Sequence, residues 1–122
     1  MRRPARFIAD QRGATAVEFA LTAPAFFALL FGALQGGLML WTQLGLQHAV
    51  ERAARCAAVN TTVCGTQDQV QTYAVSQGLA NSGNAGVFTL TTESCGKAVS
   101  ATASVRFVTT TVNLAARSCF PK

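Results

Sequence analysis

The sequence predicts an α+β fold in which a long N-terminal helix carries a three-stranded antiparallel sheet on its outer half. Three observations lead to this prediction. Ala14 to Trp41 is an almost unbroken apolar run. Residues 42–59 continue it with apolar residues at helical spacing. From Val87 onward, apolar and polar residues alternate with the period of two that is typical of strands.

The apolar run is long enough to cross a membrane. Its 28 residues include one charge, Glu18, and one amide, Gln35, whereas about 20 apolar residues already span a bilayer core. Residues 22–25 could pass for a signal-peptide cleavage site, but the apolar run continues far beyond them, unlike the short core of a secretory signal. The sequence therefore predicts a retained, single-pass transmembrane helix with Trp41 at the membrane–water interface.

The charge is concentrated ahead of this helix. Of the net charge of +5, residues 1–13 contribute +3, from four arginines and one aspartate, and the rest of the chain contributes +2. A basic segment before a membrane helix is the positive-inside signal, so we expect a cytoplasmic N-terminus and periplasmic residues 42–122. Nucleic-acid binding is not expected, because the later basic residues are scattered and lack interleaved aromatic residues.

A short motif leads into the helix: Arg12, Gly13, Ala14, Thr15, Ala16, Val17, Glu18 and Phe19. It resembles the prepilin peptidase site of type IV pilin-like proteins, in which cleavage follows the glycine and glutamate is fifth in the mature chain. With the Phe after the glutamate and Pro24 six residues later, it is most similar to the TadE-like minor pseudopilins of tight-adherence (Flp-type) pilus systems. The resemblance extends to residues 53–58 and 119–121, and it makes the expected fold a pilin-like one.

The resemblance implies that a prepilin peptidase cuts after Gly13, which makes residues 1–13 a leader. Glycine suits such a site because a protease can hold its backbone closely. Cleavage would expose the amine of Ala14, which lies on the same helical face as the carboxylate of Glu18, four residues later. In a filament, the amine of one subunit could pair with Glu18 of another and set the register between apolar helices.

Further residues of the helix are candidates for packing in an assembly. Gly32 and Gly36 form a GxxxG motif, which lets two helices approach closely in a membrane, although glycine is also simply common in membrane helices. Pro24 removes one helical hydrogen bond and predicts either a kink or a loosened segment. The assembly residues that we predict are Ala14, Glu18, Phe19, Pro24, Gly32 and Gly36.

The rest of the chain divides into short elements. We expect a transmembrane helix and stalk at 14–59, a turn at 60–65, a helix at 67–77 ended by Gly78 or Asn81, a loop at 81–86, and strands at 87–91, 99–107 and 110–119. Thr66 and Gln69 fit a capping box for the second helix. The predicted division is therefore a leader (1–13), the helix (14–59) and a small extracytoplasmic α+β domain (60–122).

The four cysteines, Cys56, Cys64, Cys95 and Cys119, all lie on the predicted outer side of the membrane. An even number in a small exported domain indicates disulfides. Three pairings are possible, and we favour Cys56–Cys64 and Cys95–Cys119 because each joins the ends of neighbouring elements. A zinc site is not expected, because there is no CxxC motif and thiolates are oxidised outside the cytoplasm.

The sequence offers little for catalysis. His48 is the one histidine, the acidic residues beyond the apolar run are far apart, and no glycine-rich phosphate loop occurs. We therefore predict a protein that is not an enzyme and has no metal, cofactor or small-molecule substrate.

Two functional hypotheses follow. The first is a minor pseudopilin of the inner membrane that is processed by a prepilin peptidase. It would bind other pilins or pseudopilins, the assembly platform and lipid, and would help to assemble an adhesive pilus that serves surface adhesion and biofilm formation, whether or not it enters the filament. The alternative is an uncleaved single-pass membrane protein that presents a small binding or sensing domain.

Overall fold

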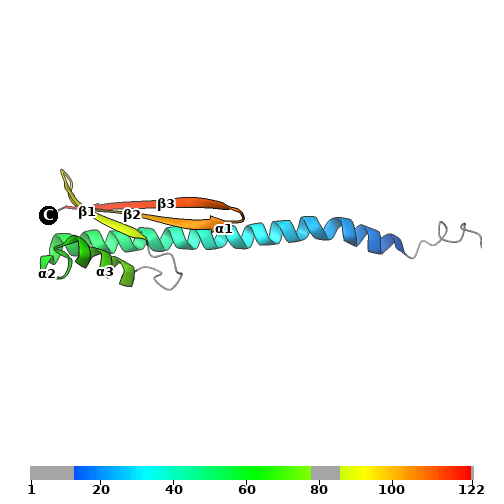
Figure 1. Ribbon diagram of the computed structural model, residues 1–122, viewed down its shortest axis with the longest axis horizontal. Helices are drawn as coiled ribbons and strands as arrows, with labels where there is room; N and C mark the ends of the chain where they lie inside the picture. The colour runs from blue at the N-terminus through cyan, green and yellow to red at the C-terminus, as the bar shows by residue number, and fades with distance from the viewer. Residues whose placement is uncertain (1–12, 78–85, 122) are drawn as a thin grey trace, which may run out of the picture. The chain divides into compact units, whose positions relative to one another are not determined.

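The computed structural model describes residues 13–77 and 86–121 (Figure 1). In chain order the elements are α1 (Ala14–Val59), α2 (Thr61–Cys64), α3 (Gln67–Gln77), β1 (Val87–Glu93), β2 (Gly96–Phe107) and β3 (Thr110–Phe120). The predicted α+β fold, with its long N-terminal helix, short helix and three-stranded antiparallel sheet, is confirmed. The predicted leader and the loop at 81–86 lie largely outside the described residues, as do Gly78 and Asn81.

The chain forms two compact units, Met1–Leu34 and Gln35–Lys122. The described part of the first unit is Gly13 and the helix that follows it. The second unit contains the rest of α1 together with every other element. The division predicted from the sequence, with boundaries after residues 13 and 59, stays a prediction.

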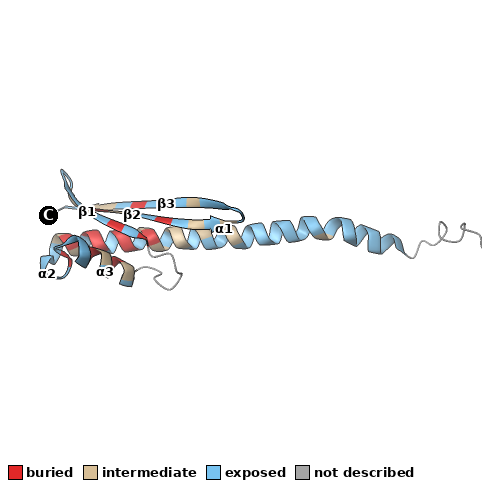
Figure 2. Cartoon of the chain, in the orientation of Figure 1, coloured by how far each residue is buried: buried red, intermediate tan, exposed pale blue. Residues whose placement is uncertain are grey.

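The core of the second unit lies between α1 and the sheet (Figure 2). The buried residues of α1 recur at helical spacing within the predicted stalk, 42–59: Leu46, Ala49, Val50, Ala53, Ala54 and Ala57. Val99, Ala101 and Ala103 of β2 and Leu114 and Ala116 of β3 belong to the same cluster. Because most of these side chains are small, the backbone of the sheet can lie close to the helix.

The segment after α1 departs from the prediction. Instead of a turn at 60–65, it forms the short helix α2. Asn60 is its N-cap, because its Oδ1 accepts hydrogen bonds from the amide of Val63 at 3.3 Å and the hydroxyl of Thr62 at 2.6 Å. Gly65 then ends the helix, and a Cβ there would lie 2.1 Å from the carbonyl oxygen of Thr61.

The helix α3 begins and ends as predicted. The amide of Gln69 donates to Thr66 Oγ1 at 3.4 Å, and Gln69 Oε1 accepts from the amide of Thr66 at 3.2 Å, so the capping box is confirmed. In α1, Glu51 and Arg55 lie four residues apart, with the acid first, which is the favourable order for an ion pair on a helix. Glu51 Oε1 instead accepts a hydrogen bond from Gln47 Nε2 at 3.1 Å.

The sheet has the order β1-β2-β3, and both pairs are antiparallel. The strands are longer than predicted, and only Ser94 and Cys95 separate β1 from β2. Gly96 follows with a φ of 125°, and a Cβ there would lie 2.3 Å from the carbonyl oxygen of Phe120, so glycine is required. The next hairpin turns at Val108, whose φ of 55° is unusual for a β-branched residue.

Two glutamines of α3 cover the outer edge of β1. Gln71 Oε1 accepts from the amide of Phe88 at 2.7 Å, and its Nε2 donates to the carbonyl of Gly86 at 3.0 Å. Gln67 Oε1 accepts from the amide of Leu90 at 2.7 Å, and its Nε2 donates to the carbonyl of Phe88. Because a side-chain amide carries the same donor and acceptor as a peptide group, the two glutamines replace part of a fourth strand.

Candidate functional site

The predicted processing residues lie at the start of α1. The helix begins at Ala14, directly after Gly13, and the residues up to Thr22 are all exposed. A Cβ at Gly13 would meet no described atom within 4 Å. Nothing within this part of the chain therefore requires glycine at 13, as expected if a protein that binds here imposes that requirement.

Glu18 lies one turn into the helix, four residues after Ala14. Its side chain is exposed, and among the described residues no basic side chain pairs with it. The hydroxyl of Thr22 donates to the backbone carbonyl of Glu18 at 3.0 Å and lies 3.3 Å from that of Phe19. The carboxylate itself is left available for a group outside this part of the chain.

From Ala14 to Leu34, α1 exposes apolar side chains all around its circumference. Phe19 is 70% exposed and Leu29 is 77% exposed. Phe27 contacts the rings of its helical neighbours, Phe26 edge-to-face with centroids 5.7 Å apart and Phe31 stacked with centroids 6.3 Å apart. At a helical rise of about 1.5 Å per residue, this part of α1 is roughly 30 Å long, which matches a bilayer core. The helix thus has the length and composition to anchor the protein in a membrane by a single pass.

The predicted packing residues are also exposed, and a second helix could approach them. The helix is continuous through Pro24, so the loosened segment considered above is not formed in the structure. A Cβ at Gly32 or Gly36 would meet no described atom within 4 Å, so the GxxxG surface is free to receive another helix.

The cysteines form the two pairs favoured above. Cys56 and Cys64 connect α1 to α2, with an S–S distance of 1.96 Å, and Cys95 and Cys119 connect the β1–β2 turn to the end of β3, with an S–S distance of 1.95 Å. The first bridge closes 8 residues and the second closes 24. Within the described ranges, no group of three or more His, Cys, Asp or Glu residues could hold a metal ion.

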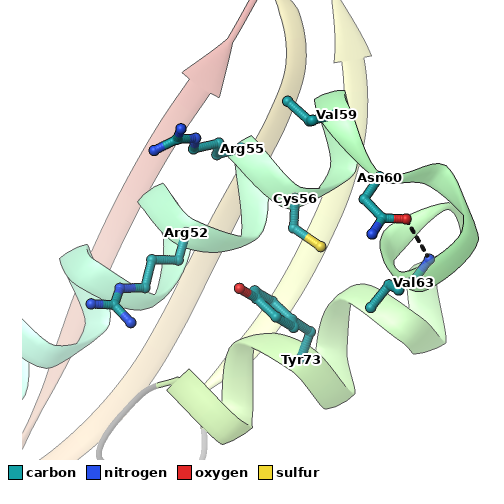
Figure 3. Close-up of a pocket in the computed structure, with 7 residues that line it drawn as sticks. All are labelled: Arg52, Arg55, Cys56, Val59, Asn60, Val63 and Tyr73. Atoms are coloured by element: carbon teal, nitrogen blue, oxygen red, sulfur yellow. Dashed lines mark hydrogen bonds between the residues drawn. The ribbon is translucent and has the colours of Figure 1, made fainter.

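An open groove of about 460 Å³ lies where the three helices meet (Figure 3). Its lining comes from the end of α1, from α2 and from α3: Arg52, Arg55, Cys56, Val59, Asn60, Val63 and Tyr73. The guanidinium of Arg52 donates to Gln77 Oε1 at 2.8 Å. The lining contains two cations and a phenol, which suit an acidic or aromatic group.

A known protein family matches Gly13 and most of α1. Residues 13–55 match the family described as TadE-like protein. The match begins at the glycine of the predicted processing site, and it confirms the family resemblance drawn from the sequence. No curated protein and no solved structure matches the chain.

The TadE-like segment, residues 13–55, contains all the predicted processing and packing residues. It ends before Cys56, so neither disulfide, neither short helix and no strand lies within it. The resemblance of residues 119–121 therefore stays a prediction. The groove was not predicted from the sequence. Arg52 and Tyr73 come together only because α3 packs on α1, and no spacing pattern in the sequence predicts that contact.

Proposed function

We propose that this protein is a minor pseudopilin of a tight-adherence pilus system. The TadE-like match supports a part in pilus assembly, together with binding to other pilus components. The finer role that we propose is a non-enzymatic one. The apolar run of α1 would sit in the inner membrane with its N-terminus in the cytoplasm, and residues 42–122 would lie in the periplasm with both disulfides formed.

One observation carries the proposal: the part of α1 that follows Gly13, from Ala14 to Leu34, is exposed and apolar, and it contains a single acid, Glu18. Such a helix needs lipid or other apolar helices around it. A carboxylate in a membrane helix costs up to about 2.5–3.5 kcal/mol at the bilayer centre and less near the end, so it usually has a partner or a function. Cleavage after Gly13 would create a suitable cation at Ala14 of a neighbouring subunit.

Processing can be tested separately from assembly. The intact mass and N-terminal sequence of the protein would be measured in membranes of cells with and without the prepilin peptidase. We expect a chain that starts at Ala14 only when the peptidase is present. A chain that keeps residues 1–13 in both strains would contradict the proposal and favour an uncleaved membrane protein.

Assembly can be tested with Glu18→Gln, which removes the charge but keeps the size of the side chain. We expect membrane insertion to persist and the number of pili per cell to fall at least tenfold, because breaking a buried ion pair by removing one partner typically costs about 3–5 kcal/mol. Gln35→Ala, which changes the one amide of the apolar run, is the matched control and should piliate normally. Normal piliation of the Glu18→Gln strain would refute the role of Glu18 in register.

The alternative of an uncleaved binding module would use the groove at Arg52, Arg55 and Tyr73 as its binding site. The groove would lie in the periplasm under both hypotheses, so it does not discriminate between them. Whether the N-terminus is cleaved after Gly13 does discriminate between them.

A further inference from the structure

The apolar run of α1 continues into the second compact unit. Its last residues, 35–41, belong to that unit. At about 1.5 Å per residue, the 28 residues of the run are roughly 42 Å long. This length matches a bilayer with its headgroup regions, about 40–45 Å, rather than the hydrocarbon core alone. When the run spans the bilayer, residues 35–41 therefore lie in the headgroup region of the outer leaflet.

The sheet covers one side of this segment. Gln35, Gly36 and Met39 are partly buried, and they lie on one face of α1. Met39 packs against the same core as Val105 of β2 and Val112 of β3, which are register partners near the β2–β3 turn. Figure 1 shows this hairpin running along α1 toward lower residue numbers of the helix.

The β2–β3 turn lies at the level of residues 35–41. The carbonyl of Ala115 in β3 accepts a hydrogen bond from Gln43 Nε2 at 2.9 Å, which aligns strand and helix at that point. From Ala115 back to Thr110 the strand covers about 16 Å, at roughly 3.3 Å per residue. From Gln43 back to Gln35 the helix covers only about 12 Å. The turn at Val108 is therefore at least as close to the membrane as Gln35.

Val108 is an unfavourable residue for a turn that is surrounded by water. Its φ of 55° lies in the left-handed region, which β-branched residues rarely adopt and which glycine, asparagine and aspartate adopt more easily. Its side chain is 62% exposed, so packing within the described residues does little to offset the strain. Strained backbone that persists in this way often marks a function. An exposed valine gains free energy when its side chain moves from water into an apolar phase.

The neighbouring part of α1 is also apolar on the sides that the sheet leaves open. Leu38 and Leu40 are each 67% exposed, and Trp41 is exposed beside them. Together with Val108, these side chains form an apolar surface at the end of the second unit that adjoins the membrane run. Such a surface needs lipid or another apolar partner.

The charges favour a membrane surface as that partner. Arg106 is exposed one residue before Phe107 at the turn. The acidic residues of the second unit lie elsewhere: Glu93 is at the opposite end of the sheet, Glu51 is two turns beyond Gln43 in α1, and Asp68 is in α3. The end of the unit that faces the membrane therefore carries a positive charge, which suits the phosphates of lipid headgroups.

We propose that the β2–β3 turn inserts the side chain of Val108 into the outer leaflet of the membrane that α1 spans, with Arg106 at the lipid phosphates. The backbone of the turn stays among the headgroups, because irregular backbone does not enter hydrocarbon exposed to lipid. The valine side chain reaches the boundary of the acyl chains, as the apolar side chains of interfacial segments do. The second unit is then held to the bilayer at two points, α1 and the turn, which fixes its orientation.

This inference rests on the membrane placement within the proposed function, and not on cleavage after Gly13 or on pilus assembly. The test uses the full chain in phosphatidylcholine nanodiscs that hold one molecule each, with a nitroxide label on Val108→Cys. The native cysteines are all paired, so the label attaches only to the introduced one. Collision rates of the label with oxygen, which dissolves in lipid, and with a water-soluble nickel complex measure its depth.

Two further labels provide the controls. Val87→Cys is matched to Val108→Cys, because Val87 is 65% exposed and lies opposite Thr102, about 16 Å along β2 from Phe107. Leu29→Cys, within the apolar run, reports whether α1 spans the bilayer. We expect the labels at 108 and 29 to collide more often with oxygen than with the nickel complex, and the label at 87 to show the reverse.

The outcomes separate this inference from the membrane placement. Labels at 108 and 87 that are equally exposed to the nickel complex, with the label at 29 in lipid, would overturn the inference and leave the placement of α1 intact. A label at 29 that is exposed to the nickel complex would overturn both. A label at 108 that neither reagent reaches would mean that protein, and not lipid, covers the turn, and would overturn the inference as well.

The role of Arg106 has its own measurement, in nanodiscs with and without anionic phosphatidylglycerol. A basic residue at an anionic surface should raise the ratio of inserted to withdrawn turns at position 108 about fivefold. We expect Arg106→Gln to abolish this rise. Lys97→Gln, at the opposite end of β2, is the matched control and should keep it. Equal responses of the two variants would overturn the assignment of Arg106 to the lipid phosphates.

Discussion

Removing the Gln71 side chain is the sharpest test of how the sheet is held at its β1 edge. Gln71→Ala deletes two hydrogen bonds, one to the amide of Phe88 and one to the carbonyl of Gly86. Phe88 is 3% exposed, and Gly86 is also buried. The change therefore leaves two backbone groups without partners in a region that water reaches poorly.

The expected loss follows from these two bonds. A typical intramolecular hydrogen bond contributes about 0.5–1.5 kcal/mol net, so the pair contributes roughly 1–3 kcal/mol. Alanine is the better helix former and recovers a few tenths of a kcal/mol in α3. We therefore expect the free energy of opening at β1 to fall by about 1–2.5 kcal/mol.

Hydrogen exchange at the amide of Phe88 measures this quantity directly, because its protection reports the free energy of opening that exposes the amide. The full chain in detergent micelles would be compared with Gln71→Ala and with Thr72→Ala. Thr72 lies next to Gln71 in α3, and its hydroxyl bonds only to the carbonyl of Asp68 in the same helix. We expect Gln71→Ala to accelerate exchange at Phe88 by roughly fivefold to seventyfold, which is the ratio that corresponds to a fall of about 1–2.5 kcal/mol. Thr72→Ala should leave the exchange rate at Phe88 unchanged.

Gln71→Glu refines the test, since it keeps the acceptor for Phe88 but loses the donor to Gly86. At neutral pH the new carboxylate would face a carbonyl oxygen, so protection should fall, and it should recover as acid protonates the carboxyl group and restores a donor. If Gln71→Ala and Thr72→Ala exchange equally at Phe88, the view that glutamines stand in for a fourth strand is refuted.

Two further predictions concern chain constraints in the second unit. The Cys95–Cys119 bridge closes 24 residues and the Cys56–Cys64 bridge closes 8, so replacing the longer bridge with serines should cost about 3.5 kcal/mol of stability, against about 2.5 kcal/mol for the shorter one. Denaturant unfolding of the two variants would show the opposite order if strand and helix contacts, rather than loop closure, set the cost. Val108→Asn should raise the melting temperature, because asparagine tolerates the φ of 55° better than valine. The free energy of unfolding should rise by up to about 1 kcal/mol. An unchanged or lower melting temperature would mean that the valine side chain contributes compensating contacts.

The sequence analysis succeeded where the signal is local and repeated. The buried face of the stalk was read from the spacing of Leu46, Val50, Ala53 and Ala57, because a helix returns to the same face every three or four residues. The capping box at Thr66 was found for the same reason, since its partners are three residues apart. The family resemblance rested on a run of neighbouring residues and was confirmed over residues 13–55.

Local reading failed where a nearby side chain competes with the expected pattern. Residues 60–65 have the composition of a turn, yet the side chain of Asn60 caps a helical turn there. Glu51 and Arg55 have the favourable spacing, yet Gln47 provides the partner of Glu51. In both cases the alternative contacts have similar small energies, so the sequence pattern does not select between them.

The sequence by itself determined the apolar helix, its basic flank, the processing motif and the alternating strands, because each of these is a property of neighbouring residues. Only the tertiary structure decided that α3 covers the β1 edge of the sheet and that α1 contacts β3. Gln67 lies 23 residues from Leu90, and Gln43 lies 72 residues from Ala115. Such contacts depend on how α3 and the sheet pack on α1. They join residues far apart in the sequence, so no local periodicity of apolar residues predicts them.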